Sequence, residues 1–183
     1  MYQYEIKIPK DRIAVLIGKK GEIKRQVEEA TNSKLKVDSK EGDVFITGED
    51  GLGLMIARDI IRAVGRGFNP EIAMRLMKQD YGFESIDMMD FARNTDDIKR
   101  VRGRVIGTNG KSRKKIEQLT ETSISIYGKT VGIIGNIEKV VLAKNARESL
   151  LNGSPHTKVY AKLERKKKES FRRGILATKR REE

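Results

Sequence analysis

Two short stretches, Ile17-Gly18-Lys19-Lys20-Gly21 and Ile106-Gly107-Thr108-Asn109-Gly110, decide how this chain is organised. Each places two glycines three positions apart after an apolar run, and a helix-like segment ending in threonine follows both. The correspondence holds at a constant offset of 107 − 18 = 89 positions, which also aligns Val27 with Ile116. A repeat that keeps its register in this way indicates two copies of one structural unit.

The glycine pairs predict a phosphate-binding loop between two helices. Glycine at both ends lets backbone N–H groups approach a phosphate, whereas a side chain at either position would block that contact. A tight helix-to-helix turn without any ligand would also use two glycines. The sequence around the loops has to decide between these two interpretations.

The first half of the chain alternates between strand and helix patterns. A strand is expected over residues 4–9, and Asp11 is the expected N-cap of a helix that the Gly18–Gly21 turn interrupts. Apolar residues at helical spacing follow from Glu22, then two strands around 35–37 and 44–47, then a helix from 52 to about 65. The predicted order is β-α-α-β-β-α.

The second half repeats this order. It has a weak strand at 83–88, a helix from about Asp97 to Ile106, the second turn, another helix, two strands and a last helix capped by Asn136. We predict an α+β protein with a first unit at 1–67, a connecting turn and short helix at 68–82, a second unit at 83–153, and a basic C-terminal helix and tail at 154–183. The apolar residues of the connection indicate closely packed units.

The charge of the chain points to a polyanionic partner. The 183 residues carry a net charge of +13, which folding does not require and nucleic-acid binding would explain. Residues 98–116 contain eight basic side chains and no acidic one, whereas a solvated helix usually alternates its charges. These eight are Lys99, Arg100, Arg102, Arg104, Lys111, Arg113, Lys114 and Lys115. The first loop is more mixed, because Asp11 and Glu22 accompany its basic residues.

The stretches 15–23 and 104–111 resemble the signature of K-homology (KH) RNA-binding domains, and the predicted element order resembles type I of that fold. Two repeats at this spacing with a basic C-terminal helix resemble a narrower family, the partner-of-Nob ribosome-assembly factors and their archaeal counterparts. The resemblance implies that each groove clamps about four single-stranded nucleotides, with the glycine loop on the RNA backbone. The RNA-binding residues it implies are Gly18, Lys19, Lys20, Gly21, Lys24, Arg25, Arg102, Arg104, Gly107, Thr108, Asn109, Gly110, Lys111, Arg113 and Lys114.

The bases of the RNA would lie against apolar residues beside each loop. The candidates are Ile17, Ile23, Val27 and Val37 in the first repeat and Ile106, Ile116 and Ile126 in the second. Amphipathic helices bury one face, so each of these residues could instead belong to the core. The second repeat, with its uniformly basic surroundings, is the better predicted RNA site, and the first could face a protein.

Enzymatic chemistry is not expected. Residues 105–112 are similar in sequence to the phosphate-binding loop of nucleotide hydrolases. However, Val105 replaces the first glycine of that motif, and a basic, helix-like stretch precedes it instead of an apolar strand. The chain has one histidine and no cysteine, and no acidic cluster at metal-ligand spacing, so no cofactor or metal is predicted. No apolar run approaches the roughly 20 residues of a membrane span, and we expect a cytoplasmic protein.

The tail carries about half of the net charge, with eleven basic residues against four glutamates from 151 to 183. Val159, Leu163 and Phe171 form a narrow apolar edge that could dock while the basic face meets RNA. Beyond Gly174, disorder is the favoured interpretation. The predicted partner is single-stranded ribosomal RNA. The alternative is an adaptor that recruits a ribosome-assembly nuclease or a translation initiation factor, with RNA contact secondary.

Overall fold

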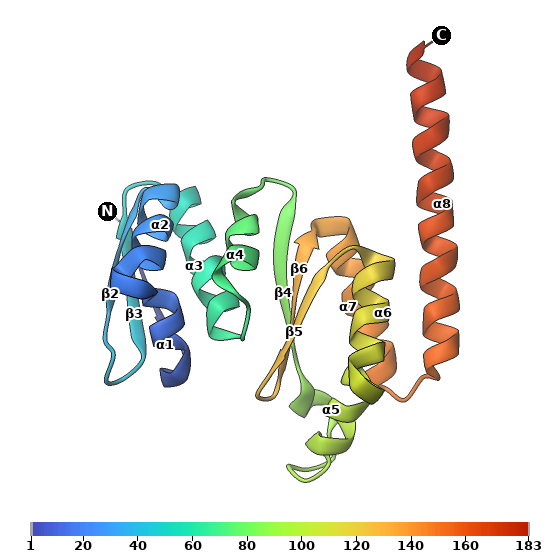
Figure 1. Cartoon of the computed structure of the whole chain (residues 1–183), viewed down its shortest axis with the longest axis horizontal. Coiled ribbons are helices and arrows are strands. Elements are labelled where there is room, and N and C mark those ends of the chain that lie inside the picture. Colours follow the sequence, from blue (N-terminus) through green and yellow to red (C-terminus); the bar gives the residue numbers. More distant parts are fainter. Residues whose placement is uncertain (1, 183) are drawn as a thin grey trace.

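The protein is described by a computed structural model, which covers the backbone of residues 2–182 and the side chains of residues 2–175 (Figure 1). Its first half contains a strand, two helices separated by a short turn, two strands and a long helix. These are β1 (Tyr2–Lys7), α1 (Lys10–Ile17), η1 (Lys19–Gly21), α2 (Glu22–Thr31), β2 (Ser33–Val37), β3 (Asp43–Gly48) and α3 (Gly51–Gly65).

The second half repeats this order and adds a C-terminal helix. After the connection, α4 (Pro70–Ala73) and η2 (Met74–Met77), come β4 (Tyr81–Asp87), η3 (Met88–Phe91), α5 (Ile98–Ile106), η4 (Thr108–Gly110), α6 (Lys111–Thr120), β5 (Ser123–Tyr127), β6 (Thr130–Asn136), α7 (Ile137–Leu151) and α8 (His156–Glu182). The predicted α+β fold of two type I KH units followed by a helix is therefore confirmed.

Each unit has a three-stranded antiparallel sheet whose central strand comes last in the chain. The strand orders are β1-β3-β2 and β4-β6-β5, and Ile46 of β3 lies opposite Tyr4 on one side and Leu35 on the other. Alternate residues of β3 are buried, because helices cover only one face of this first sheet. The opposite face of the first sheet remains open.

The second sheet is covered on both faces, which sequence patterning did not predict. Val131 and Ile133 of β6 face the core of the second unit, while Ile134 joins the core of the first unit with Phe68. The rings of Phe68 and Phe83 meet edge to face at 6.2 Å, and a β-carbon at Gly132 would lie 2.7 Å from the Phe68 ring. The helices of the first unit therefore pack on the second sheet.

Figure 1 shows the resulting layers: first sheet, first helices, second sheet, second helices and finally α8. The expected close packing of the two units is confirmed by these contacts. They are joined at the edge by Tyr127 of β5, whose hydroxyl donates a hydrogen bond to the Asp11 carboxylate. Arg12 also lies over the Tyr127 ring, 5.9 Å from its centroid.

Several element ends differ from their predicted positions. Asp11 is not the N-cap of α1, because the helix begins at Lys10 after Pro9, whose fixed φ suits a helix start. β4 begins at Tyr81 instead of Phe83. The side chain of Asn136 does cap α7, accepting a hydrogen bond from the Glu138 amide. The bounds of α8 extend to Glu182, past Gly174, although the side chains of residues 176–183 lie outside the described part.

Candidate nucleic-acid interface

The two glycine loops have nearly the same backbone. Gly18 has φ 72° and ψ 179°, and Gly107 has φ 72° and ψ 170°, a region that is essentially restricted to glycine. The loops then turn through left-handed conformations at Lys20 and Asn109, with φ 53° and 52°. The sequence repeat is thus a repeat of local geometry, and each loop joins two helices rather than a strand and a helix. This arrangement does not match a nucleotide-hydrolase phosphate loop.

The two glycines of each loop have different structural roles. A β-carbon at Gly107 would lie 2.7 Å from the Ser112 backbone nitrogen, so the first glycine permits α6 to approach α5 closely. At Gly110, by contrast, a β-carbon would meet nothing within 4 Å, although φ is 74°. Gly18 and Gly21 repeat this contrast. The second glycine of each loop leaves its backbone open to a ligand.

The basic side chains around the second loop separate into engaged and unengaged groups. Arg100 binds Asp97, with one nitrogen-oxygen distance of 2.9 Å, and this contact holds the pKa of the Asp97 carboxyl well below its usual range. Lys115 pairs with Glu164 at 3.2 Å, and Arg113 lies 3.8 Å from Glu117. Within the part of the chain that the structure describes, the side chains of Lys99, Arg102, Lys111 and Lys114 have no hydrogen-bond or ion-pair partner.

Arg104 has a structural task that the sequence did not indicate. Its Nε donates to the Leu150 carbonyl at 2.9 Å and its Nη2 to the Ser154 carbonyl at 2.8 Å. Arg12 binds the matching carbonyls of Val64 and Phe68 in the first repeat. Two nitrogen atoms of Arg104 therefore support the end of α7 and the turn into α8, and its predicted phosphate contact stays a prediction.

The first loop is less available as a cation site. Arg25 folds back so that its Nε and Nη2 donate, both at 3.4 Å, to carbonyls of its own loop, and Lys24 lies 3.7 Å from Glu28. Lys19 and Lys20 are exposed at the tip. The two loops share one backbone but differ in the charge they offer.

A buried arginine, which sequence reasoning missed, lies beneath the second loop. Arg147 of α7 is 0% exposed and donates to the carbonyls of Val105 and Arg113, on the two helices that flank the loop. Burial lowers its pKa to about 10, so it stays charged at neutral pH. α3 and α7 align from their N-caps, Asp50 and Asn136, so the equivalent residue in the first repeat is Ile61, which is 0% exposed. Its spacing from Val140 and Leu150 places Arg147 on the buried face of α7, and this was the signal in the sequence that could have found it.

The predicted apolar groove residues divide between core and surface. Val27 and Ile116 are 0% exposed and belong to the cores, so bases cannot lie against them. Ile17, Val37 and Ile126 are half-buried and pack against the cores. Ile23 and Ile106, next to the glycine loops, are also half-buried. These five residues keep an accessible part, whereas the alternative of a core role holds for the other two.

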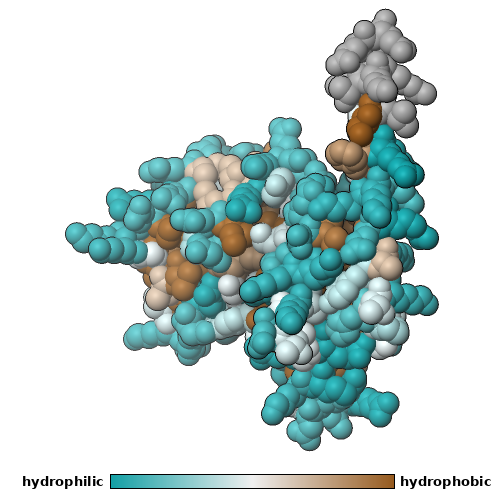
Figure 2. Space-filling model, turned by 45° about the vertical axis from the view of Figure 1, so that its right-hand side comes forward, coloured by the Kyte–Doolittle hydropathy of each residue, from teal (hydrophilic) through white to brown (hydrophobic). Residues whose placement is uncertain are grey.

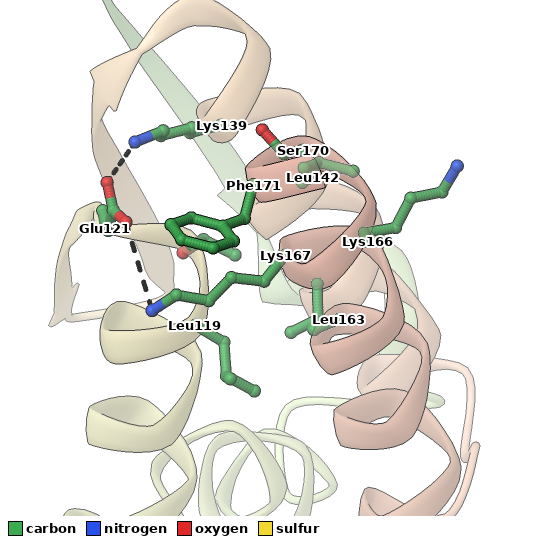
Figure 3. A pocket seen from close by; sticks show the side chains of 10 residues that line it. Leu119, Glu121, Lys139, Leu142, Leu163, Lys166, Lys167, Ser170 and Phe171 are labelled. Atoms are coloured by element: carbon green, nitrogen blue, oxygen red, sulfur yellow. Dashed lines mark hydrogen bonds and ion pairs between the residues drawn. The ribbon is translucent and has the colours of Figure 1, made fainter. Parts of the chain in front are cut away.

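The C-terminal helix is anchored on the second unit by part of its predicted apolar edge. Val159 and Leu163 are each 5% exposed, but Phe171 is 71% exposed and is not buried as predicted. Figure 3 shows Leu163 and Phe171 facing Leu119 across a hollow at the outer end of this contact. Glu121 accepts there from Lys139 and lies 4.0 Å from Lys167. Phe171 lines this hollow but remains largely exposed to solvent, and α8 continues beyond the body of the unit (Figure 1).

The outer surface around α5 and along α8 is mainly hydrophilic, and apolar atoms appear in it as separate patches (Figure 2). Among the described residues, no group of histidine, cysteine, aspartate or glutamate side chains could hold a metal ion. Nor does any described helix have the length and apolarity needed to cross a membrane. The candidate site is therefore a pair of loops with open backbone, and the second loop lies in a cationic surface.

The fold and these loops define a tandem KH protein, and comparisons with known proteins narrow the class. Residues 82–168 match the model described as eukaryotic type KH-domain, type I, and residues 3–63 match the KH domain model. The first match includes the beginning of α8, which thus forms part of the second domain. The prediction of two KH domains is confirmed.

Similar proteins come from archaea and eukaryotes. The KH domain-containing protein MJ0443 of Methanocaldococcus jannaschii is 50% identical over 88% of this chain and 73% of its own length. The RNA-binding protein pno1 of Dictyostelium discoideum is 30% identical over 87% of this chain and 69% of its own. A chain in the crystal structure of the a/eIF2alpha-aDim2p-rRNA complex from Pyrococcus horikoshii is 48% identical, with a TM-score of 0.85 and coverage of 92% and 95%.

The chain belongs to the PNO1/Dim2 (partner-of-Nob) family of KH-domain proteins, and the resemblance seen in its sequence is confirmed. This is a family of RNA-binding KH proteins rather than a known family of enzymes.

Proposed function

We propose that this protein binds single-stranded RNA through its second glycine loop, and that the RNA is small-subunit ribosomal RNA during ribosome assembly. The observation that carries the proposal is the loop at Gly107–Gly110, where open backbone lies among four basic side chains that have no partner within the described residues. Phosphate contacts from backbone N–H groups and cations provide most of the affinity of such complexes. The proposed role is non-enzymatic and cytoplasmic.

Ribosomal RNA is the proposed ligand because of the relatives. The Pyrococcus horikoshii complex contains rRNA with aDim2p, and the Dictyostelium relative is an RNA-binding protein. The RNA-binding residues of the second repeat that we retain are Arg102, Arg104, Gly107, Thr108, Asn109, Gly110, Lys111 and Lys114, with Arg113 beside them. In the first repeat, Gly18, Lys19, Lys20 and Gly21 provide a second, weaker loop, and Lys24 and Arg25 are partly engaged within the protein.

A matched pair of substitutions at Gly110 tests the RNA site. Asparagine and aspartate both tolerate the left-handed conformation, and no atom lies within 4 Å of a β-carbon there, so both variants should fold. Gly110→Asp places a carboxylate where the phosphate would bind. We expect Gly110→Asp to lower the affinity for a short single-stranded RNA by at least about tenfold, since hydrogen bonds to charged groups contribute about 1.5–3 kcal/mol.

Gly110→Asn is the steric control, and Gly21→Asp is the same change in the first repeat. Gly110→Asp should lower RNA affinity more than either control. In titrations at several salt concentrations, the affinity of Gly110→Asp should also depend less steeply on salt than that of wild type. Equal RNA binding by folded Gly110→Asp and wild type would refute the proposed site.

A protein partner is the second candidate function, and it concerns the first repeat. The Pyrococcus horikoshii complex includes a/eIF2alpha, and the first loop here carries mixed charge. We therefore propose a translation initiation factor as a partner, and the family also makes a ribosome-assembly nuclease a candidate. Calorimetric titration with each purified protein, using wild type and Lys20→Glu, tests this. Heat of binding that is unchanged by Lys20→Glu would contradict a role for the first loop.

A further inference from the structure

The second glycine loop has two sides, and one of them faces α8. Arg102 and Ile106 lie one turn apart on α5 and do not line the side that faces α8. Gly103 and Arg104 of α5 and its C-cap Gly107 line a hollow bordered by the start of α8. We call this the α8-side hollow. It is open to solvent and has a volume of about 440 Å³, within the size range of small-molecule sites.

The wall of the α8-side hollow contains an unused hydrogen-bonding group. Ser112 lines it and is 2% exposed, yet its Oγ has no hydrogen-bond partner among the described residues. A buried hydroxyl without a partner is costly and calls for an explanation. In the first repeat the equivalent residue is Ile23, so the repeat itself does not require a hydroxyl at this position.

The other groups around the hollow suit a nucleotide. None of its lining residues is acidic, and Lys111 contributes an ammonium group that is without a partner in the described chain. His156 and Tyr160, one turn apart on α8, form an aromatic pair with ring centroids 6.0 Å apart. The His156 ring is fixed by a 2.9 Å hydrogen bond between its Nε2 and the Arg104 carbonyl.

A second hollow extends the path away from the loop. It shares Lys111 and Tyr160 with the first and adds Lys114, Lys115 and Gln118 of α6. The two hollows adjoin on the surface along α6 and α8, beginning beside Gly107 and Thr108, the residues already proposed to contact the RNA backbone. A strand of RNA that contacts the loop can therefore continue across these hollows.

We propose that the α8-side hollow binds the nucleotide that follows the stretch held in the groove, as an additional RNA subsite of this chain. Ser112 Oγ would bond its phosphate or ribose, Lys111 would neutralise the phosphate, and the His156–Tyr160 pair would contact its base. Aromatic contacts with bases tolerate any sequence. This subsite rests on the proposed function of the second loop, and it gives α8 a role in RNA binding that depends on its position rather than on charge alone.

RNA length separates this subsite from the loop. Ser112→Ala breaks no hydrogen bond among the described residues and removes a costly buried hydroxyl, so it should not lower the melting temperature. With an eight-nucleotide RNA we expect Ser112→Ala to bind about 3- to 10-fold more weakly, as for the loss of one hydrogen bond of ordinary strength. Tyr160→Leu should lose about 5-fold or more through base stacking. With a four-nucleotide RNA both variants should bind like wild type.

Gly110→Asp distinguishes failure of the subsite from failure of the proposed function. Gly110→Asp should weaken the binding of both RNAs. If it weakens the binding of neither, the assignment of the loop as an RNA site is wrong. If Gly110→Asp weakens both RNAs but Ser112→Ala and Tyr160→Leu weaken neither, only the subsite is refuted. Equal losses for the two lengths would also refute it, because the substitutions would then act through the loop. Tyr4→Leu, a change at an exposed tyrosine of the first unit, is the control for composition.

Discussion

The first glycine of the second loop should contribute to stability far more than the second, and alanine substitutions measure the difference. At Gly107, with ψ near 170°, alanine would occupy a region that costs about 1–3 kcal/mol. Its β-carbon would also lie 2.7 Å from the Ser112 backbone nitrogen, and such overpacking costs about 1–3 kcal/mol more. We expect Gly107→Ala to lower the free energy of unfolding by about 4 kcal/mol.

At Gly110 only the left-handed conformation opposes alanine, at about 1–2 kcal/mol, and the loss of unfolded-state entropy returns about 0.4–1 kcal/mol. Gly110→Ala should therefore cost about 1 kcal/mol. Urea denaturation followed by circular dichroism measures both variants, and Gly18→Ala with Gly21→Ala repeats the comparison in the first unit. Equal losses for Gly107→Ala and Gly110→Ala would refute the division of tasks between the two glycines.

Three further outcomes are expected. Arg147→Met, which leaves two carbonyls beneath the loop without their donor, should cost about 1–3 kcal/mol in urea denaturation, against under about 0.5 kcal/mol for half-exposed Arg58→Met; similar losses would contradict the anchoring role. The hydrogen bond to Asp11 raises the pKa of the Tyr127 hydroxyl above its ordinary value of 10.0. This hydrogen bond therefore stabilises the protein below pH 10.0, and the stabilisation is lost as pH rises through the higher folded-state pKa. Ultraviolet titration should lose a late-ionising component in Tyr127→Phe relative to wild type, and an unaltered titration would rule this out. Deletion of residues 171–183, which spares the buried contacts of α8, should flatten the salt dependence of RNA binding, and an unchanged slope would count against RNA contact by the tail.

The local geometry of the loops could be predicted from the sequence because local rules fix it. A constant offset of 89 positions located both loops, and the structure gives Gly18 and Gly107 the same φ of 72°. Apolar periodicity likewise located the helices and strands to within a few residues. What a residue touches across the fold follows from no such rule. The two hydrogen bonds of Arg104 span 46 and 50 positions, and no pattern near Arg104 announces them.

The same limit applies to burial that depends on packing between units. Sequence patterning treats a sheet as half-exposed, yet β6 is buried along nearly its whole length because the first unit covers its other face. The prediction that Phe171 is buried was wrong for the opposite reason. Its spacing from Leu163 fits one helical edge, but α8 outlasts the surface that it packs on, so the same edge is buried at one end and exposed at the other.

These packing differences give the two repeats different properties despite their matching loops. The second unit is held by the first unit on one face of its sheet and by α8 on its helices, and Arg147 binds both helices around its loop. In the described part of the first unit, the position of Arg147 is taken by the buried apolar Ile61, which cannot donate hydrogen bonds to the helices around its loop. A loop that is already held in one geometry loses less conformational entropy when it binds. Preorganisation and unpaired cations therefore favour the same loop, which explains how a duplicated unit can divide its tasks without changing its backbone.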